Sequence, residues 1–164
     1  MTLVSKRSKT QDDETYLALG FAERNKSDDP KSRLVPQSGV GAIIVKHGQV
    51  ISRSANVLPP KLKERLTVDG IDIGEAERYH LIEHAERAAI FIALLEGQSI
   101  EGATMYCTRH PCSDCARAIV WAGISRLVLA SGLAGEQRWL EAQRAARHIL
   151  KLGGVSVRVL QRAN

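Results

Sequence analysis

The chain has 164 residues, of which 44% are hydrophobic, and this is enough for one domain with a full hydrophobic core. No apolar stretch reaches the length of a membrane span, the first residues lack the apolar core of a signal peptide, and three cysteines are an odd number for a disulfide scaffold, so we expect a cytoplasmic domain without membrane contact. The formal charge of +5 suits an anionic small molecule or nucleic acid, and solubility would also explain it, but with only 4% aromatic residues to stack on bases a small-molecule partner is favoured over nucleic acid.

The N-terminal part of the chain contains a polar arm followed by a helix. Residues 1–10 are expected to be a flexible arm, ahead of a single domain over residues 11–164. Thr10 or Asp12 can cap a helix that continues to about Arg24, because apolar residues recur along this stretch.

Two strand-like runs come next. GVGAIIV (39–45) and QVISRSANV (49–57) are joined by KHG and predict a β-hairpin. The charged stretch 58–74 has no firm period, so we expect a long loop with one helical turn at most. Long ordered loops in compact domains are often functional, and this one could cover a site.

The second half of the chain alternates helices and strands. From His84 to about Glu96 nearly every residue after Arg87 is apolar, which predicts a helix buried on all sides that ends at Gly97. The remaining expected elements are strands at 103–108, 126–131 and 155–160 and helices at 112–122 and 136–152. This alternation indicates parallel strands joined by right-handed crossovers, so the fold class is α/β, with three α/β/α layers.

The segment HPCSDC (110–115) places two thiols at the start of a helix. Pro111 is well suited to open the helix, and Cys112 and Cys115 then lie on one face of its first turn. The helix dipole and the free N–H groups lower the pKa of thiols there and favour metal binding. Alone, the pair is compatible with redox chemistry, with half of a zinc site or with two buried small residues. Cys107 falls in a strand and is expected to be a buried small hydrophobe.

His84 and Glu86 indicate a catalytic site only in combination with these cysteines. Taken alone, His84 would be a core or capping histidine, and Glu86 a solvated residue in the first turn of a helix. Together the two motifs form His-x-Glu followed by Pro-Cys-x-x-Cys, the pattern of zinc deaminases. It predicts one catalytic Zn²⁺ held by His84, Cys112 and Cys115 with an open position for water, while Glu86 moves protons without binding the metal.

With these motifs the chain resembles the cytidine and deoxycytidylate deaminase family over residues 15–160. The resemblance also includes VGAIIV, SAN, ATMYCT, AGISRLVLAS and LGGVSVRVL, in the order of the family. It implies a five-stranded mixed sheet with strand order 2-1-3-4-5 and helices on both faces, and a homo-oligomer.

Within the family the chain is most similar to the deoxycytidylate deaminases. They share the order of RSANVLPP, an insertion at 58–83 and YHLIEHAER. The long helix before the last strand favours a parallel crossover over a hairpin at that position, as in deoxycytidylate, tRNA adenosine, guanine and riboflavin-pathway deaminases. Two departures concern the substrate: Ala88 stands where the family often has Asn, and SGLAGEQ replaces a Ser-Asp…Tyr segment.

Four residues are candidates for contact with the substrate: Asn56, Ala85, Arg109 and His110. The resemblance implies the role of Asn56, and His110 precedes Pro111 at the rim of the site. Asn56 would contact the sugar or the base, although such a residue can also be a turn residue at the end of a strand. A phosphate requires Arg, Lys or backbone N–H groups, and the candidates are Lys61, Lys63, Arg65 and Arg109, each of which can equally be a solvated surface charge.

We therefore expect a zinc-dependent aminohydrolase that acts on a cytosine nucleotide or nucleoside, with conversion of dCMP to dUMP and ammonia as the first hypothesis. Within the same chemistry, the alternatives are guanine, a riboflavin precursor or adenosine in tRNA. A further alternative is a non-catalytic, zinc-stabilised interaction domain, which would not need Glu86.

Overall fold

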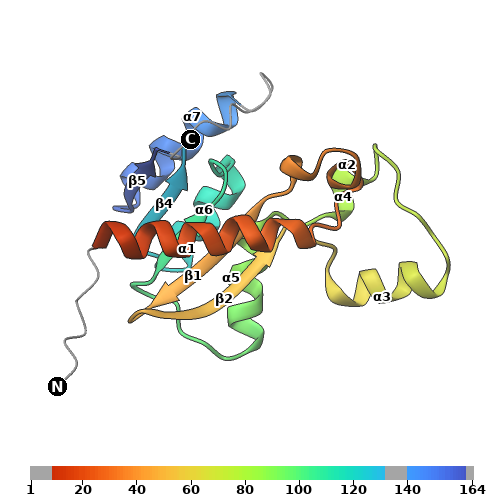
Figure 1. Cartoon of the computed structure of the whole chain (residues 1–164), viewed down its shortest axis with the longest axis horizontal. Coiled ribbons are helices and arrows are strands. Elements are labelled where there is room, and N and C mark those ends of the chain that lie inside the picture. Colours follow the sequence, from red (N-terminus) through yellow and green to blue (C-terminus); the bar gives the residue numbers. More distant parts are fainter. Residues whose placement is uncertain (1–8, 132–139, 162–164) are drawn as a thin grey trace.

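The computed structural model describes residues 9–131 and 140–161, and its elements are labelled in Figure 1. Five strands form one sheet in the order β2-β1-β3-β4-β5. β1 is antiparallel to β2 and to β3, whereas β3, β4 and β5 are parallel to one another. The strands are β1 Gly41–Lys46, β2 Gln49–Ala55, β3 Thr104–Cys107, β4 Arg126–Ala130 and β5 Ser156–Leu160. The predicted mixed sheet and its strand order are confirmed.

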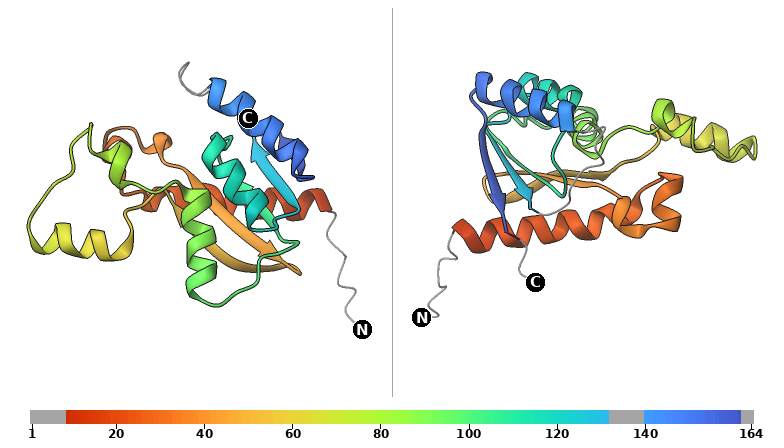
Figure 2. Two further views of the ribbon diagram at one scale, coloured as in Figure 1. Left: turned by 180° about the vertical axis from the view of Figure 1, so that it is seen from behind. Right: turned by 90° about the horizontal axis from the view of Figure 1, so that it is seen from above.

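Helices lie on both faces of this sheet, as the view from above in Figure 2 shows. Helix α1 covers one face, and α5, α6 and α7 cover the other. The helices are α1 Lys9–Glu23, η1 Arg24–Lys26, α2 Pro30–Leu34, η2 Pro36–Ser38, α3 Pro60–Val68, α4 Arg78–Leu81, α5 Ala85–Leu95, α6 Ser113–Trp121 and α7 Leu140–Leu152. The predicted three-layer α/β/α class is confirmed.

Side-chain alternation along the strands explains why both faces are covered. Successive strand residues point to opposite faces, and in the inner strands both sets are apolar. One set packs with α5, α6 and α7, and includes Ala42, Ile44, Met105, Leu127 and Leu129. The other set packs with α1, and includes Ile43, Val45, Tyr106 and Val128. A sheet that is apolar on both sides is stable only between two helical layers.

The β1–β2 hairpin and the packing of α1 on the sheet each depend on a glycine. His47 and Gly48 both have positive φ, 51° and 76°, as a two-residue type I′ turn between β1 and β2 requires. Gly41 starts β1 directly under α1, where an added Cβ would be 2.0 Å from the carbonyl oxygen of Gly20. The absence of a side chain at Gly41 therefore lets α1 approach the sheet closely.

The structure changes two boundaries in the first half of the chain. Helix α1 begins at Lys9, so residues 9 and 10, which we assigned to the flexible arm, are helical; residues 1–8 lie outside the described residues. The predicted loop 58–74 contains the nine-residue helix α3, so that prediction was wrong. Pro60 opens α3, and Leu62 and Leu66, one turn apart, are its half-buried residues.

The prediction that the helix after His84 is buried on all sides was also wrong. The small residues of α5 face the sheet, but Phe91, Leu94 and Leu95 are 45%, 72% and 80% exposed. Composition alone does not show which face of an apolar helix the rest of the chain covers. In the last predicted helix, residues 140–152 form α7, whereas 136–139 lie outside the described residues. No helix within the described ranges is long and apolar enough to cross a membrane.

Asp13 of α1 ties this helix to three strands of the sheet. Its carboxylate is 1% exposed and accepts hydrogen bonds from both Nη atoms of Arg126 in β4 (2.7 and 2.6 Å), from Arg158 in β5 (2.7 Å) and from the Tyr106 hydroxyl in β3 (3.0 Å). Burial disfavours the charged form, but hydrogen bonds from Arg126 and Tyr106 outweigh it and hold the pKa of Asp13 below its ordinary value. The ionised form therefore stabilises the fold above about pH 4, and this stabilisation is lost as the pH falls further.

We predict that Asp13→Asn lowers the free energy of unfolding by about 3–5 kcal/mol at pH 7, because it removes the buried charge that pairs with the partly exposed guanidinium groups of Arg126 and Arg158. Urea unfolding of both proteins measures this difference, which should shrink toward pH 3. Asp69→Asn is the control, since it breaks the Arg65–Asp69 pair, whose arginine side chain is 74% exposed, and should change the free energy by less than about 1 kcal/mol. Equal effects of the two substitutions would contradict the role of Asp13.

Candidate active site

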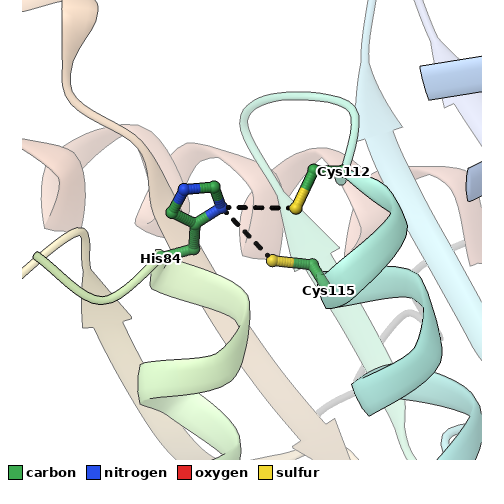
Figure 3. A group of neighbouring side chains, drawn as sticks. All are labelled: His84, Cys112 and Cys115. Atoms are coloured by element: carbon green, nitrogen blue, oxygen red, sulfur yellow. Dashed lines mark hydrogen bonds between the residues drawn. The ribbon is translucent and has the colours of Figure 1, made fainter. Parts of the chain in front are cut away.

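The three predicted metal ligands meet at the N-terminal ends of α5 and α6, as Figure 3 shows. His84 precedes α5 in an extended conformation, at φ −70° and ψ 145°. Cys112 precedes α6 at φ −79° and ψ 175°, and Cys115 is in the first turn of that helix. Pro111 stands before the N-cap Cys112 and not at the first helical position, so the helix begins at Ser113, one residue after the predicted start at 112.

The distances between the donor atoms fit a tetrahedral zinc ion. His84 Nδ1 lies 3.6 Å from Cys112 Sγ and 3.4 Å from Cys115 Sγ, and the three ligand atoms are all within 4.8 Å of one another. Zinc bonds of about 2.3 Å to sulfur and about 2.0–2.1 Å to nitrogen, at tetrahedral angles, separate N from S by about 3.6 Å. One imidazole and two thiols leave a fourth position for water. The residues present therefore fit the predicted zinc site.

The three ligand groups shift one another's pKa in the metal-free chain. A hydrogen bond from Cys115, together with one from His84, lowers the pKa of the Cys112 thiol to about 4. The same hydrogen bond and burial raise the pKa of Cys115. The hydrogen bond to Cys112 raises the pKa of His84 to about 8. Protons thus compensate the negative charge of the sulfurs in the metal-free chain, and a bound cation would replace them.

Glu86 is on the first turn of α5 and is directed into the same pocket. It is 3% exposed, and burial raises its pKa above the ordinary value for a glutamate. A carboxyl group whose pKa is moved toward neutrality can both accept and donate a proton near pH 7. By contrast Cys107 is fully buried in β3 outside the ligand group, and burial raises the pKa of its thiol well above the ordinary value. Cys107 is the buried small residue that we predicted.

A cavity of about 390 Å³ opens in front of the ligand group. This volume is in the range of small-molecule sites. Its lining includes His84, Glu86 and Cys112, and also Asp29, Lys31, Ser38, Val40, Asn56, Arg78, Tyr79, Arg109, His110 and Gln143. The cavity therefore combines the ligand group with polar and cationic side chains that could orient a polar substrate.

All four predicted substrate contacts, Asn56, Ala85, Arg109 and His110, line this cavity. The Nη2 of Arg109 donates to the Gln37 carbonyl at 3.2 Å, its buried Nε has no hydrogen-bond partner, and no carboxylate within residues 9–131 and 140–161 forms an ion pair with it.

The other three phosphate candidates lie outside the lining of the cavity. Lys61, Lys63 and Arg65 are exposed on α3. Lys63 pairs with Asp28 and Arg65 with Asp69, each at 2.7 Å. Their interpretation as surface charges is the one that the structure favours.

Sequence reasoning missed one group of pocket residues. Asp29 comes from the segment before α2, and Arg78 and Tyr79 come from α4, within the insertion 58–83 but after the charged stretch 58–74. Arg78 and Asp29 form an ion pair of 2.7 Å although 49 positions separate them in the chain. No local pattern marks such a pair.

Comparison with known proteins agrees with the geometry. The family model described as the cytidine and deoxycytidylate deaminase zinc-binding region matches residues 10–131. Deoxycytidylate deaminase of Enterobacteria phage T2 is 33% identical over 125 residues, which cover 54% of this chain and 66% of the phage protein. Deoxycytidylate deaminase of Mus musculus is 28% identical over 152 residues, covering 88% of this chain and 77% of the mouse protein. The chain thus spans slightly less than two thirds of the phage T2 relative.

Among solved structures, the dCMP deaminase of cyanophage S-TIM5 in its apo form superposes with a TM-score of 0.67. It is 23% identical in sequence, and the match covers 93% of this chain and 100% of that one. This likeness shows the same fold.

We predict that Cys115→Ser lowers zinc affinity by more than about 100-fold, because it removes one of three ligands from a site with no spare donor. The zinc content of the purified protein, measured after dialysis, should fall from one ion per chain to a trace. Cys107→Ala is the matched control, since it removes a buried thiol outside the ligand group and should leave the zinc content unchanged. Full zinc content in Cys115→Ser would exclude this set of ligands.

Proposed function

The chain belongs to the cytidine and deoxycytidylate deaminase family, and we propose that it is a zinc-dependent aminohydrolase that converts dCMP to dUMP and ammonia. One observation carries the proposal: the His84, Cys112 and Cys115 group and the buried carboxyl of Glu86 face one cavity. A purely structural zinc site has four protein ligands and no need of an adjacent acid. This site has three ligands among the described residues, and Glu86 beside them.

Zinc at this site would supply a Lewis acid that lowers the pKa of water, so that the water can attack at neutral pH. Glu86 then acts as general base and general acid. Its carboxylate accepts a proton from the attacking water and delivers it to the ring nitrogen next to C4. The proton of the resulting C4 hydroxyl then passes through Glu86 to the exocyclic amino group, the bond between C4 and that nitrogen breaks as the C4 carbonyl forms, and ammonia leaves. The raised pKa of Glu86 suits it to this two-way transfer.

Deoxycytidine monophosphate (dCMP) is the proposed substrate on two grounds. The curated relatives from phage T2 and mouse are deoxycytidylate deaminases. In addition, Arg109 presents a guanidinium at the cavity without a carboxylate partner in the described chain, and a guanidinium in that state is suited to bind a phosphate. Asn56, which also lines the cavity, would contact the sugar or base.

The homo-oligomer expected from the family resemblance would need an apolar contact surface. Leu94 and Leu95 at the end of α5 and Trp121 at the end of α6 are 72%, 80% and 94% exposed. Exposed apolar side chains of this size are compatible with a subunit contact, and the homo-oligomer implied by the family resemblance stays a prediction.

We predict that Glu86→Gln lowers kcat for dCMP by at least about 10²–10⁴-fold, because the amide cannot carry protons. Ammonia release and zinc content are measured on the same preparation, and the zinc content should remain at one ion per chain. Glu96→Gln, the same substitution at the exposed end of α5, is the control and should retain activity. A Glu86→Gln protein that keeps most of its activity would remove Glu86 from the mechanism.

A further inference from the structure

The insertion, residues 58–83, leaves and rejoins the domain at an isolated β-bridge. Val57 and Glu83 exchange both backbone hydrogen bonds, at 3.0 and 2.8 Å. Val57 directly follows Asn56, and Glu83 directly precedes His84, so the base of the insertion joins a candidate substrate contact to a candidate metal ligand. Helix α3 projects away from the sheet in Figures 1 and 2. Contacts beyond the bridge must therefore fix how the insertion borders the pocket.

The carboxylate of Asp29 makes the contact that links the insertion to the pocket. Its Oδ1 accepts a hydrogen bond from the Lys31 backbone N–H at 2.9 Å and so caps α2. Its Oδ2 accepts from Arg78 Nη1 at 2.7 Å and lies 3.5 Å from Asn56 Nδ2. One oxygen therefore serves the helix, and the other serves two side chains of the pocket wall.

Asn56 has only one orientation in these surroundings. Its Oδ1 accepts a hydrogen bond from the Val40 backbone N–H at 2.8 Å, so its Nδ2 points to Asp29. The residue is 6% exposed. An amide whose two ends face a fixed donor and a fixed acceptor cannot flip without losing both contacts. The Val40 N–H and the Asp29 carboxylate together thus determine which atoms Asn56 presents to a substrate.

Arg78 belongs to the insertion, and its ion pair with Asp29 connects the insertion to the segment before α2. Arg78 is 7% exposed, its Nη2 donates to the Tyr79 hydroxyl at 2.6 Å, and its guanidinium stacks on the Tyr79 ring at 4.2 Å. Both residues line the cavity. Arg78 also forms an ion pair of 3.0 Å with Glu75, whose side chain is 69% exposed. Asp29 is the buried carboxylate of the group, and without Arg78 its charge would lose its guanidinium partner.

We propose that Asp29 is a positioning residue for the deamination: it orients the Asn56 amide toward the substrate and, through Arg78, makes the insertion a fixed wall of the substrate pocket. This inference rests on the proposed function, because it assigns the role of Asn56 in that reaction. Asp29 itself does not touch the reacting atoms in this account.

Asp29→Asn tests the proposal sharply, because the carboxylate uses both of its oxygens as acceptors and an amide supplies only one. Asparagine still caps a helix well, so its oxygen can keep the Lys31 contact. Its NH₂ group then faces the donors of Asn56 and Arg78. We expect the KM for dCMP to rise about 10- to 100-fold, the loss of one or two hydrogen bonds to charged groups, while kcat changes less than about threefold and zinc stays at one ion per chain.

Lys63→Met is the matched control. Lys63 also ties the insertion to the segment before α2, through Asp28 at 2.7 Å, but its side chain is 55% exposed and lies outside the lining of the pocket. Exposed ion pairs contribute little, so this variant should keep its KM within about twofold. An unchanged KM in Asp29→Asn, or an equal rise in both variants, would overturn the proposal.

A second variant and a second readout separate positioning from folding and from the proposed function. Asp29→Asn combined with Arg78→Met leaves no unpaired buried charge, so it should fold, yet its KM should stay raised because Asn56 still faces a donor. Hydrogen–deuterium exchange of residues 78–83 should be faster in Asp29→Asn than in Lys63→Met, whatever the substrate. A double variant with normal KM, or equal exchange in the two single variants, would contradict the role of Asp29. If the unaltered protein released no ammonia from dCMP, the proposed function would fail. The exchange result would still test whether Asp29 holds the insertion in place through Arg78.

Discussion

The arrangement of the site depends on two helix starts held side by side on one face of the sheet. His84 and Cys112 each occupy the extended position before a helix, and Cys115 follows in the first turn of the second one. Because α5 and α6 pack on the same sheet face, their N-terminal ends bring a nitrogen and two sulfurs to within 4.8 Å of one another. The helix dipoles and free N–H groups at this end favour thiolates. The fold thus provides both the spacing and the electrostatic setting that a cation needs.

The ionisable groups of the site balance one another's charge. Burial acts on Glu86, and burial and neighbouring sulfurs act on the cysteines, whose charges are balanced by protons or by a cation. Elsewhere in the lining, the charge of Asp29 is matched by Arg78 in a buried pair, and Arg109 forms no ion pair with a carboxylate of residues 9–131 and 140–161. The lining therefore offers a guanidinium that could receive an anionic group of a ligand.

Sequence patterns revealed the chemistry of the site but only part of its wall. His84, Glu86, Cys112 and Cys115 fall in two short motifs, and local spacing was sufficient to find them. The strand order followed from the family resemblance, and the structure confirms it. The Asp29–Arg78 pair could not be found in this way, because 49 positions separate its members and only the folded insertion joins them. Helix α3 was missed because its apolar signal is two leucines, and the exposed side of α5 because an apolar sequence does not reveal which face is covered.

The central claim is that this cavity deaminates a cytosine nucleotide and recognises its phosphate. Ammonia release by the zinc-loaded protein from dCMP, deoxycytidine, cytidine, guanine and adenine compounds tests it most directly, with Arg109→Met assayed beside the unaltered chain. The account predicts the highest kcat/KM for dCMP, and about a 10- to 100-fold loss in Arg109→Met for dCMP but not for deoxycytidine, as the removal of a charged hydrogen bond implies. Equal rates on dCMP and deoxycytidine, or ammonia from none of the cytosine compounds, would contradict it.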